Sequence, residues 1–159
     1  MINQDFGKIW LLGPQRYLYI ESNVISSLMN YRQKNDQTEA GGCLLGFYRG
    51  SHIHINRCTT PMSGDLRQKY RFDRRDRYHV ITAKEIHKQS GRKCTYLGDW
   101  HSHPEDIPTP SKFDYQEWDK ITLIKREWPT VALVVGRTDF WVGVGCATNK
   151  IRYQLKKVF

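Results

Sequence analysis

Three side chains that can bind a metal ion, together with one hydroxyl group, lie within fourteen residues of the sequence. His101 and His103 are separated by a single residue, and Ser111 and Asp114 come after seven further residues. Two imidazoles and one carboxylate leave the fourth position of a tetrahedral zinc ion open, which is typical of catalytic rather than structural zinc sites. The pattern therefore predicts a metal-dependent hydrolase.

A strand must present the two histidines. We predict this strand over residues Thr95 to His103, where it leads directly into the pair. Residues i and i+2 of a strand point to the same face, so His101 and His103 present both imidazoles on one side while Trp100 and Ser102 face the other.

A loop and a helix must then bring the chain back toward the histidines. Residues 104–110 include three prolines, which lack an amide donor and fix φ, so we predict no regular structure there. Ser111 is expected to begin a helix, and the first turn of that helix can direct the Asp114 carboxylate at the two imidazoles.

Each half of this pattern is common when taken alone. Two histidines at this spacing are frequent on exposed strands, and Ser-x-x-Asp is a frequent way to begin a helix. Only the combination favours a metal site. Helix capping and catalysis are compatible, because Ser111 can begin the helix and also offer its hydroxyl to a substrate.

The segment Gly98-Asp99-Trp100-His101-Ser102-His103-Pro104, with Pro108-Thr109-Pro110-Ser111 and Asp114 after it, resembles the JAMM (MPN+) metalloprotease family, in particular its bacterial stand-alone branch. The stretch Thr38 to Gly46 is similar to the family's upstream glutamate and the apolar strand next to it. The order of elements fits from about Ser22 to Cys146. The first twenty residues and the basic segment Asp65 to Arg77 match no motif that we can name.

This resemblance implies a role for each matching residue. His101, His103 and Asp114 would bind one Zn²⁺ per chain, with a water molecule in the fourth position. Glu39 would take a proton from that water and deliver it to the leaving amine. Ser111 would donate a hydrogen bond to the oxyanion.

Two of the carboxylates have ordinary alternatives. Without the resemblance, Glu39 reads as an exposed loop residue. Asp99 shares the strand face of His101, so it can orient a ligand imidazole, but a surface carboxylate is equally consistent with the sequence.

The resemblance also implies a substrate class. Members of the family cleave amide bonds between the C-terminus of a ubiquitin-like modifier, or of another conjugated protein, and a target lysine. Similar bacterial proteins occur with E1- and E2-like enzymes in CBASS antiphage systems, where they release a CD-NTase-type nucleotidyltransferase from its conjugates. We therefore expect an isopeptidase with such protein partners.

The charge supports a different alternative. The net charge is +9, and much of it lies between Arg67 and Arg77. A nucleic-acid-associated protein of the same fold, without peptidase activity, is consistent with such a charge, and so is a basic surface with no specific partner. Asp65, Asp73 and Asp76 interrupt the run, so nucleic acid is not the favoured partner.

Composition limits the compartment. No apolar run approaches the length of a membrane span, and the first five residues lack a basic leader that runs into an apolar stretch. The four cysteines are scattered without a Cys-x-x-Cys pair, which is typical of reduced core thiols rather than of a disulfide framework. We expect a cytoplasmic protein without membrane contact.

The rest of the chain predicts the α/β fold class, with residues 1–159 forming a single domain in which helices flank a mixed β-sheet. The resemblance specifies this as the MPN (JAMM) fold, which is cytidine-deaminase-like. The expected elements, in order, are extended chain from Lys8 to Ile20, a helix from Ser22, strands at 42–48 and 53–58, a short strand at 70–72, a helix from Asp73 or Asp76 to about Lys88, and strands at 130–136, 140–146 and 151–158.

Several side chains are assigned to packing rather than to chemistry. The core candidates are Trp100, Trp118, Val131, Leu133 and Val135, and on the helix ending near Lys88 they are Tyr78, Ile81 and Ile86, with Val80 as a further candidate. His52 and His54 repeat the spacing of the motif, but no Ser-x-x-Asp comes after them, so they are interpreted as polar strand residues. His79 and His87 have no ligand partner at motif spacing.

Overall fold

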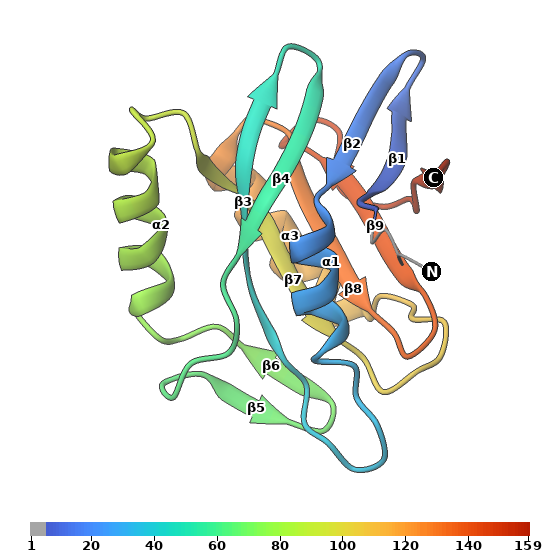
Figure 1. Ribbon diagram of the computed structural model, residues 1–159. Coiled ribbons are helices and arrows are strands. Elements are labelled where there is room, and N and C mark those ends of the chain that lie inside the picture. The colour runs from blue at the N-terminus through green and yellow to red at the C-terminus, as the bar shows by residue number, and fades with distance from the viewer. Residues whose placement is uncertain (1–5) are drawn as a thin grey trace, which may run out of the picture.

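The computed structural model describes residues 6–159, so the first five residues, where the sequence predicts no secretory leader, lie outside the described part (Figure 1). Ten strands form one eight-stranded sheet, in the order β10-β1-β2-β4-β3-β7-β8-β9, and a separate β5-β6 hairpin. The strands are β1 (Lys8–Gly13), β2 (Arg16–Ile20), β3 (Gly41–Arg49), β4 (His52–Cys58), β5 (Leu66–Gln68), β6 (Arg71–Asp73), β7 (Thr95–Ser102), β8 (Thr130–Val135), β9 (Phe140–Gly145) and β10 (Lys156–Lys157).

The large sheet is mixed. The β2-β4 and β7-β8 pairs are parallel, and the other neighbours are antiparallel. A parallel pair needs a crossover connection, and the connection from β7 to β8 contains helix α3 (Lys112–Lys125). This crossover returns the chain over the end of β7, where the two histidines lie.

Helices cover both faces of the sheet. Helix α1 (Ser22–Met29) buries Val24, Ile25 and Leu28 in the largest apolar cluster, which also takes Leu133 and its alternate neighbours on β8. The side chains that point the other way, such as Val134, pack with Trp118 of α3 in a second cluster. Figure 1 shows α1 and α3 on opposite sides of the sheet.

The predicted core is confirmed on the strands and on α3. Trp100 is 1% exposed and Trp118 is 4% exposed, and the three predicted β8 residues are all buried. All four cysteines are free thiols, as expected, but only Cys43 and Cys94 are buried. Among residues 6–159, no helix combines the length and apolar character that crossing a lipid bilayer requires.

Helix α2 (Tyr78–Gln89) differs from the prediction. Tyr78, Val80 and Ile81 are exposed, and the buried side chain is His79. Ile86 does face inward, where it packs on the third apolar cluster of Cys43, Leu45 and Cys94.

The inward position of His79 has a physical reason. Its Nε2 atom lies 2.7 Å from Oδ2 of Asp65, and its Nδ1 atom lies 2.6 Å from Oγ1 of Thr59, so both ring nitrogens are satisfied inside the protein. A prediction based on apolar residues misses this inward face of α2, because its buried side chain is a histidine.

The predicted last strand is also wrong for most of its length, because only Lys156–Lys157 pairs with the sheet, at β1. Ile151 packs in the α3-side cluster, whereas Leu155 packs against the α1-side cluster. The segment therefore passes from one face of the sheet to the other beside β9, where the Leu155 amide donates to the carbonyl of Val142 at 2.8 Å, and this crossing interrupts a regular strand ladder.

Candidate active site

The register of β7 sets the direction of His101. His101 pairs with Gly41 of β3 and with Val134 of β8, so it lies on the face that α3 covers. Strand β7 ends at Ser102, and the amide of His103 continues the pairing by donating to the carbonyl of Val135 at 3.0 Å. Both imidazoles therefore face the beginning of α3.

A capping box fixes the carboxylate on α3. The Asp114 amide donates to Oγ of Ser111 at 3.1 Å, and the Ser111 amide donates to Oδ2 of Asp114 at 2.8 Å. Reciprocal contacts of this kind satisfy two otherwise unpaired amides at the start of a helix. The predicted helix start at Ser111 is thus confirmed, and it holds Asp114 facing the histidines.

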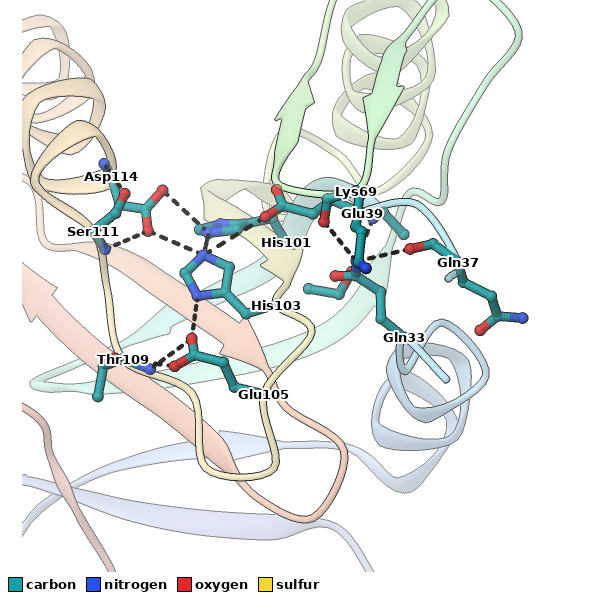
Figure 2. Close-up of polar contacts among 12 residues, drawn as sticks. Gln33, Gln37, Glu39, Lys69, His101, His103, Glu105, Thr109, Ser111 and Asp114 are labelled. Carbon is teal, nitrogen blue, oxygen red and sulfur yellow. Dashed lines mark hydrogen bonds and ion pairs between the residues drawn. The ribbon is translucent and has the colours of Figure 1, made fainter. Parts of the chain in front are cut away.

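Three ligand atoms converge at this point (Figure 2). Oδ1 of Asp114 lies 3.2 Å from Nε2 of His101, Oδ2 lies 3.2 Å from Nε2 of His103, and the two Nε2 atoms are 3.0 Å apart. A tetrahedral ion with bonds of about 2.0–2.1 Å needs ligand atoms roughly 3.3 Å apart. The donor set therefore fits a divalent metal ion.

Glu39 lies beside the three ligand residues without joining them. Its Oε1 atom is 4.0 Å from Nε2 of His103, and only 4% of the residue is exposed. Burial raises the pKa of Glu39 to about 8, because the charged form loses water, although His103 acts in the opposite direction. The exposed loop carboxylate that the sequence alone suggests is therefore wrong.

The β5-β6 hairpin fixes the main chain of Glu39. The Glu39 amide donates to the carbonyl of Gln68 at 2.7 Å, and Nε of Arg67 donates to the carbonyl of Glu39 at 2.9 Å. Phe72 fills the space beside Gly41, where a Cβ atom would lie 2.3 Å from its ring. The hairpin, which falls in the basic segment without an identified motif, is thus part of the site.

Asp99 does not orient His101. Its carboxylate lies 3.4 Å from the Arg74 guanidinium and accepts a hydrogen bond from the hydroxyl of Tyr96 at 3.0 Å. Glu105, which is outside the ligand set, does contact a ligand imidazole, because its Oε1 atom lies 3.0 Å from Nδ1 of His103. Two signals in the sequence could have identified it: its position two residues after a candidate ligand, and the match of His103-Pro104-Glu105 to the end of the family's strand motif.

The site is electrostatically coupled. Burial acts to raise the pKa of Asp114, but contacts with His101 and His103 outweigh it and hold that pKa well below its usual range. Burial acts to lower the pKa of His103, and the carboxylate of Asp114 reverses this and raises it. A buried carboxylate that stays ionised beside two imidazoles is suited to bind a cation.

A cavity of about 1040 Å³ opens over these residues. The hairpin residues Arg71 and Phe72 line one side, and Phe113 and Trp118 of α3 line the other. Glu39, Ser111 and the three candidate ligands all border the cavity, so the five residues singled out in the sequence lie around one accessible space.

The mixed sheet, its three helices and this arrangement of side chains define a JAB-type domain. The family model for prokaryotic homologs of the JAB domain matches residues 21–147, and the chain belongs to this family. The resemblance to JAMM proteins and the predicted α/β MPN fold are thereby confirmed. That residues 1–159 form one domain remains a prediction.

Relatives named CD-NTase/cGAS isopeptidase match most of the chain. The relative from Escherichia coli (strain TW11681) is 36% identical over 89% of this chain and 87% of its own length. The relative from Vibrio cholerae is 40% identical over 78% of this chain and 79% of its own length. The solution structure of a protein from Desulfitobacterium hafniense superposes with a TM-score of 0.59 over 87% of this chain and 88% of that protein, at 17% identity, which supports the fold alone.

Proposed function

We propose that this protein is a zinc-dependent isopeptidase that cleaves the amide bond joining the C-terminus of a CD-NTase-type nucleotidyltransferase to a target protein. The observation that carries the proposal is the buried Glu39 carboxylate, 4.0 Å from His103, beside a convergent His-His-Asp set. The names of the relatives support both the hydrolase class and the conjugated substrate. They do not favour the nucleic-acid-associated alternative.

His101, His103 and Asp114 would hold the zinc ion. When bound, the ion would act as a Lewis acid that makes water a nucleophile near neutral pH and polarises the scissile carbonyl. Asp114 would remain ionised throughout, because its hydrogen bonds favour the charged form. One ion per chain is expected from one such set among the described residues.

Glu39 would be the general base and then the general acid. Its high pKa makes it a good proton carrier near neutrality, and a nearby cation would lower that pKa and favour the carboxylate that accepts a proton. The hydrogen bonds from Arg67 and to Gln68 fix its main chain. The carboxylate can thus take a proton from water and return it to the leaving lysine amine.

Ser111 would stabilise the negative charge that develops on the carbonyl oxygen. Its oxygen accepts a hydrogen bond from the Asp114 amide, which leaves the hydroxyl proton available for donation. Ser111 is exposed and borders the cavity. A donor held at a helix start requires little reorganisation during the reaction.

The substrate would enter as an extended C-terminal tail between the hairpin and α3. The cavity there exceeds what a single side chain needs, and a pocket of several hundred Å³ or more accommodates several residues. We further propose that E1- and E2-like enzymes form the conjugate in the cytoplasm and that this protein reverses their action.

Cleavage of a defined conjugate tests the proposal. A CD-NTase-type protein joined through its C-terminal residue to a lysine of a second protein is incubated with the zinc-loaded enzyme, and the products are identified by mass. We expect release of both intact proteins, loss of cleavage with a chelator and recovery with Zn²⁺. An intact conjugate, or equal cleavage by metal-free protein, would contradict the proposal.

A further inference from the structure

Glu105 contacts the side of the His103 ring that faces away from the other ligand atoms. Its Oε1 atom lies 3.0 Å from Nδ1 of His103, while Nε2 of the same ring faces His101 and Asp114. An ionised carboxylate only accepts hydrogen bonds. The contact therefore holds a proton on Nδ1 and directs the Nε2 lone pair toward the metal position.

The two ligand histidines differ in this respect. Among the described residues, Asp114 is the only carboxylate in ion-pair contact with His101. His103, in contrast, contacts Asp114, Glu39 and Glu105. The ring with the most carboxylate neighbours is also the one next to the proposed base, Glu39.

Glu105 is itself held in place by the loop (Figure 2). The amide of Thr109 donates to Oε1 of Glu105 and its hydroxyl donates to Oε2, both at 3.4 Å. These contacts orient the plane of the carboxylate toward His103. They are long for hydrogen bonds, so the support that Thr109 gives is weaker than the direct contact to the ring.

The main chain of the loop is fastened to the turn between β8 and β9. The Arg137 amide donates to the carbonyl of Glu105 at 2.8 Å, and the Thr138 amide donates to the carbonyl of Asp106 at 3.0 Å. Gly136 allows the close approach, because a Cβ atom there would lie 2.5 Å from Pro108 and 2.6 Å from the carbonyl of Asp106. The main chain that carries Glu105 is thus held in place by the turn between β8 and β9.

We infer that Glu105 is a positioning residue, which sets the tautomer and the orientation of His103 for metal binding. The inference rests on the metal-binding part of the proposed function. It assigns a role to a residue outside the ligand set, the base and the oxyanion donor. The effect assigned to Glu105 is exerted through the His103 ring.

Zinc affinity measures this role without any substrate. Zn²⁺ is titrated against a chelating competitor with the wild type and with Glu105→Ala and Glu105→Gln. Loss of a carboxylate behind a ligand histidine weakens metal binding by about 10–100-fold, and since the Glu105 side chain is 42% exposed, we expect a value near tenfold for Glu105→Ala. Glu105→Gln should lose less, because its amide oxygen still accepts from Nδ1.

Glu117→Ala is the matched control. Glu117 borders the same cavity but pairs with Lys120 on the helix surface, so its removal changes local charge without touching His103. Wild-type zinc affinity is expected for this variant. An equal loss in Glu117→Ala and Glu105→Ala would reduce the effect to general electrostatics and overturn the inference.

The nitrogen resonances of the His103 ring give a readout that a structural role would not move. In the metal-free proteins we expect the Nδ1-protonated form in the wild type and in Glu105→Gln, and a mixture of tautomers in Glu105→Ala. If Glu105→Ala does not fold, Thr109→Val provides a milder version of the same test. Unchanged zinc affinity with an unchanged tautomer in the variants would overturn the inference. Failure of the wild type to cleave conjugates would instead remove the proposed function and leave these zinc measurements valid.

Discussion

The chain contains two His-x-His pairs in the same eight-stranded sheet, and only one of them forms a metal site. His101 lies on β7, His103 directly follows its last residue, and both converge with Asp114 within 4.8 Å. His52 and His54, on β4, have the same spacing and lie two strands away in the sheet. The i, i+2 spacing of two histidines is therefore not sufficient for a metal site.

The β4 pair is occupied by other contacts. Nε of Arg49 donates to Nδ1 of His54 at 2.9 Å, so Nε2 carries the proton that meets Oε1 of Glu21 at 2.7 Å. The His52 ring stacks on Tyr17 with an interplanar angle of 4°. The Tyr17 amide also donates to Nδ1 of His52 at 3.1 Å, so Nδ1 of both rings already accepts a hydrogen bond and neither ring offers a free lone pair to a cation.

The two pairs differ in the path that the chain takes after each strand. After β7, the crossover to β8 returns through a rigid loop and α3, which places a carboxylate on the same face as the histidines. After β4, the chain continues into the turn around Thr59 and then into the β5-β6 hairpin, and it supplies no carboxylate to His52 or His54. In this protein, the segment that follows each strand determines whether a carboxylate reaches the histidine pair.

Replacing one histidine of each pair with alanine should give the largest difference in zinc affinity and cleavage between the two pairs. Structural zinc sites bind the ion with apparent energies of about 10–16 kcal/mol shared among their ligands, so loss of one ligand in His103→Ala is expected to lower zinc affinity at least about 100-fold and to abolish measurable cleavage. His54→Ala should keep both. Metal content by mass spectrometry and the conjugate assay measure these outcomes, and a zinc-free His54→Ala would refute the distinction between the pairs.

Glu39→Gln separates metal binding from catalysis within the β7 site. Loss of a general base lowers the rate by about 10²–10⁴-fold, because the amide cannot accept the proton. Zinc affinity and thermal stability should stay near wild type, since Glu39 is not in the ligand set. Full activity in a variant verified by mass would exclude Glu39 as the base.

Ser111→Ala should have a smaller effect with two parts. Removal of an oxyanion donor costs about 10²–10³-fold in kcat, and loss of a helix cap costs about 1 kcal/mol of stability. Steady-state kinetics and chemical unfolding separate the two contributions. A stability loss with unchanged kcat would assign Ser111 to capping alone.

His79 is a buried histidine that lies outside both pairs. Its contact with Asp65 is expected to affect stability only, in contrast to the histidines of the β7 site. Burial acts to raise the pKa of Asp65, but hydrogen bonds from the Asp76 amide and the His79 ring outweigh it and lower that pKa. A lowered folded-state pKa stabilises the protein above the unfolded value of about 3.9, and this contribution is lost as pH falls through the folded value.

Asp65→Asn should therefore destabilise the protein by about 1.5–3 kcal/mol at neutral pH and by less in acid. Denaturant unfolding of both proteins at about pH 7 and about pH 3 gives the two differences, while cleavage per folded molecule should be unchanged at neutral pH. A difference that does not depend on pH would show that the Asp65 carboxylate contributes nothing through its charge.

The ligand half of the site could be predicted because it is local. His101, His103, Ser111 and Asp114 lie on one strand, one loop and one helix start, and each of these has a direct signal in the sequence. The core on β8 was predictable for the same reason, since a continuous apolar run indicates a strand buried on both faces.

The remaining parts depend on pairing over long distances. Glu39 lies 62 residues before His101, and the hairpin that fixes it has no motif. The packing of His79 required Asp65 and Thr59, and the path of residues 151–158 depended on which face each apolar side chain reached. The resemblance of Thr38 to Gly46 did identify Glu39. The contacts that hold its main chain, the packing of His79 and the path of residues 151–158 appear as neither a period nor a short spacing, so only the folded chain reveals them.

The hydrogen bonds between the Glu39 main chain and the hairpin also limit how the site could be transplanted. A designer who grafts the segment from His101 to Asp114 onto a comparable strand, loop and helix would carry over the ligands together with their capping box and Glu105. Glu39 would be left behind, because it lies outside this segment and its main chain is held by Gln68 and Arg67 in a separate part of the chain. Such a graft should yield a zinc-binding protein without hydrolase activity.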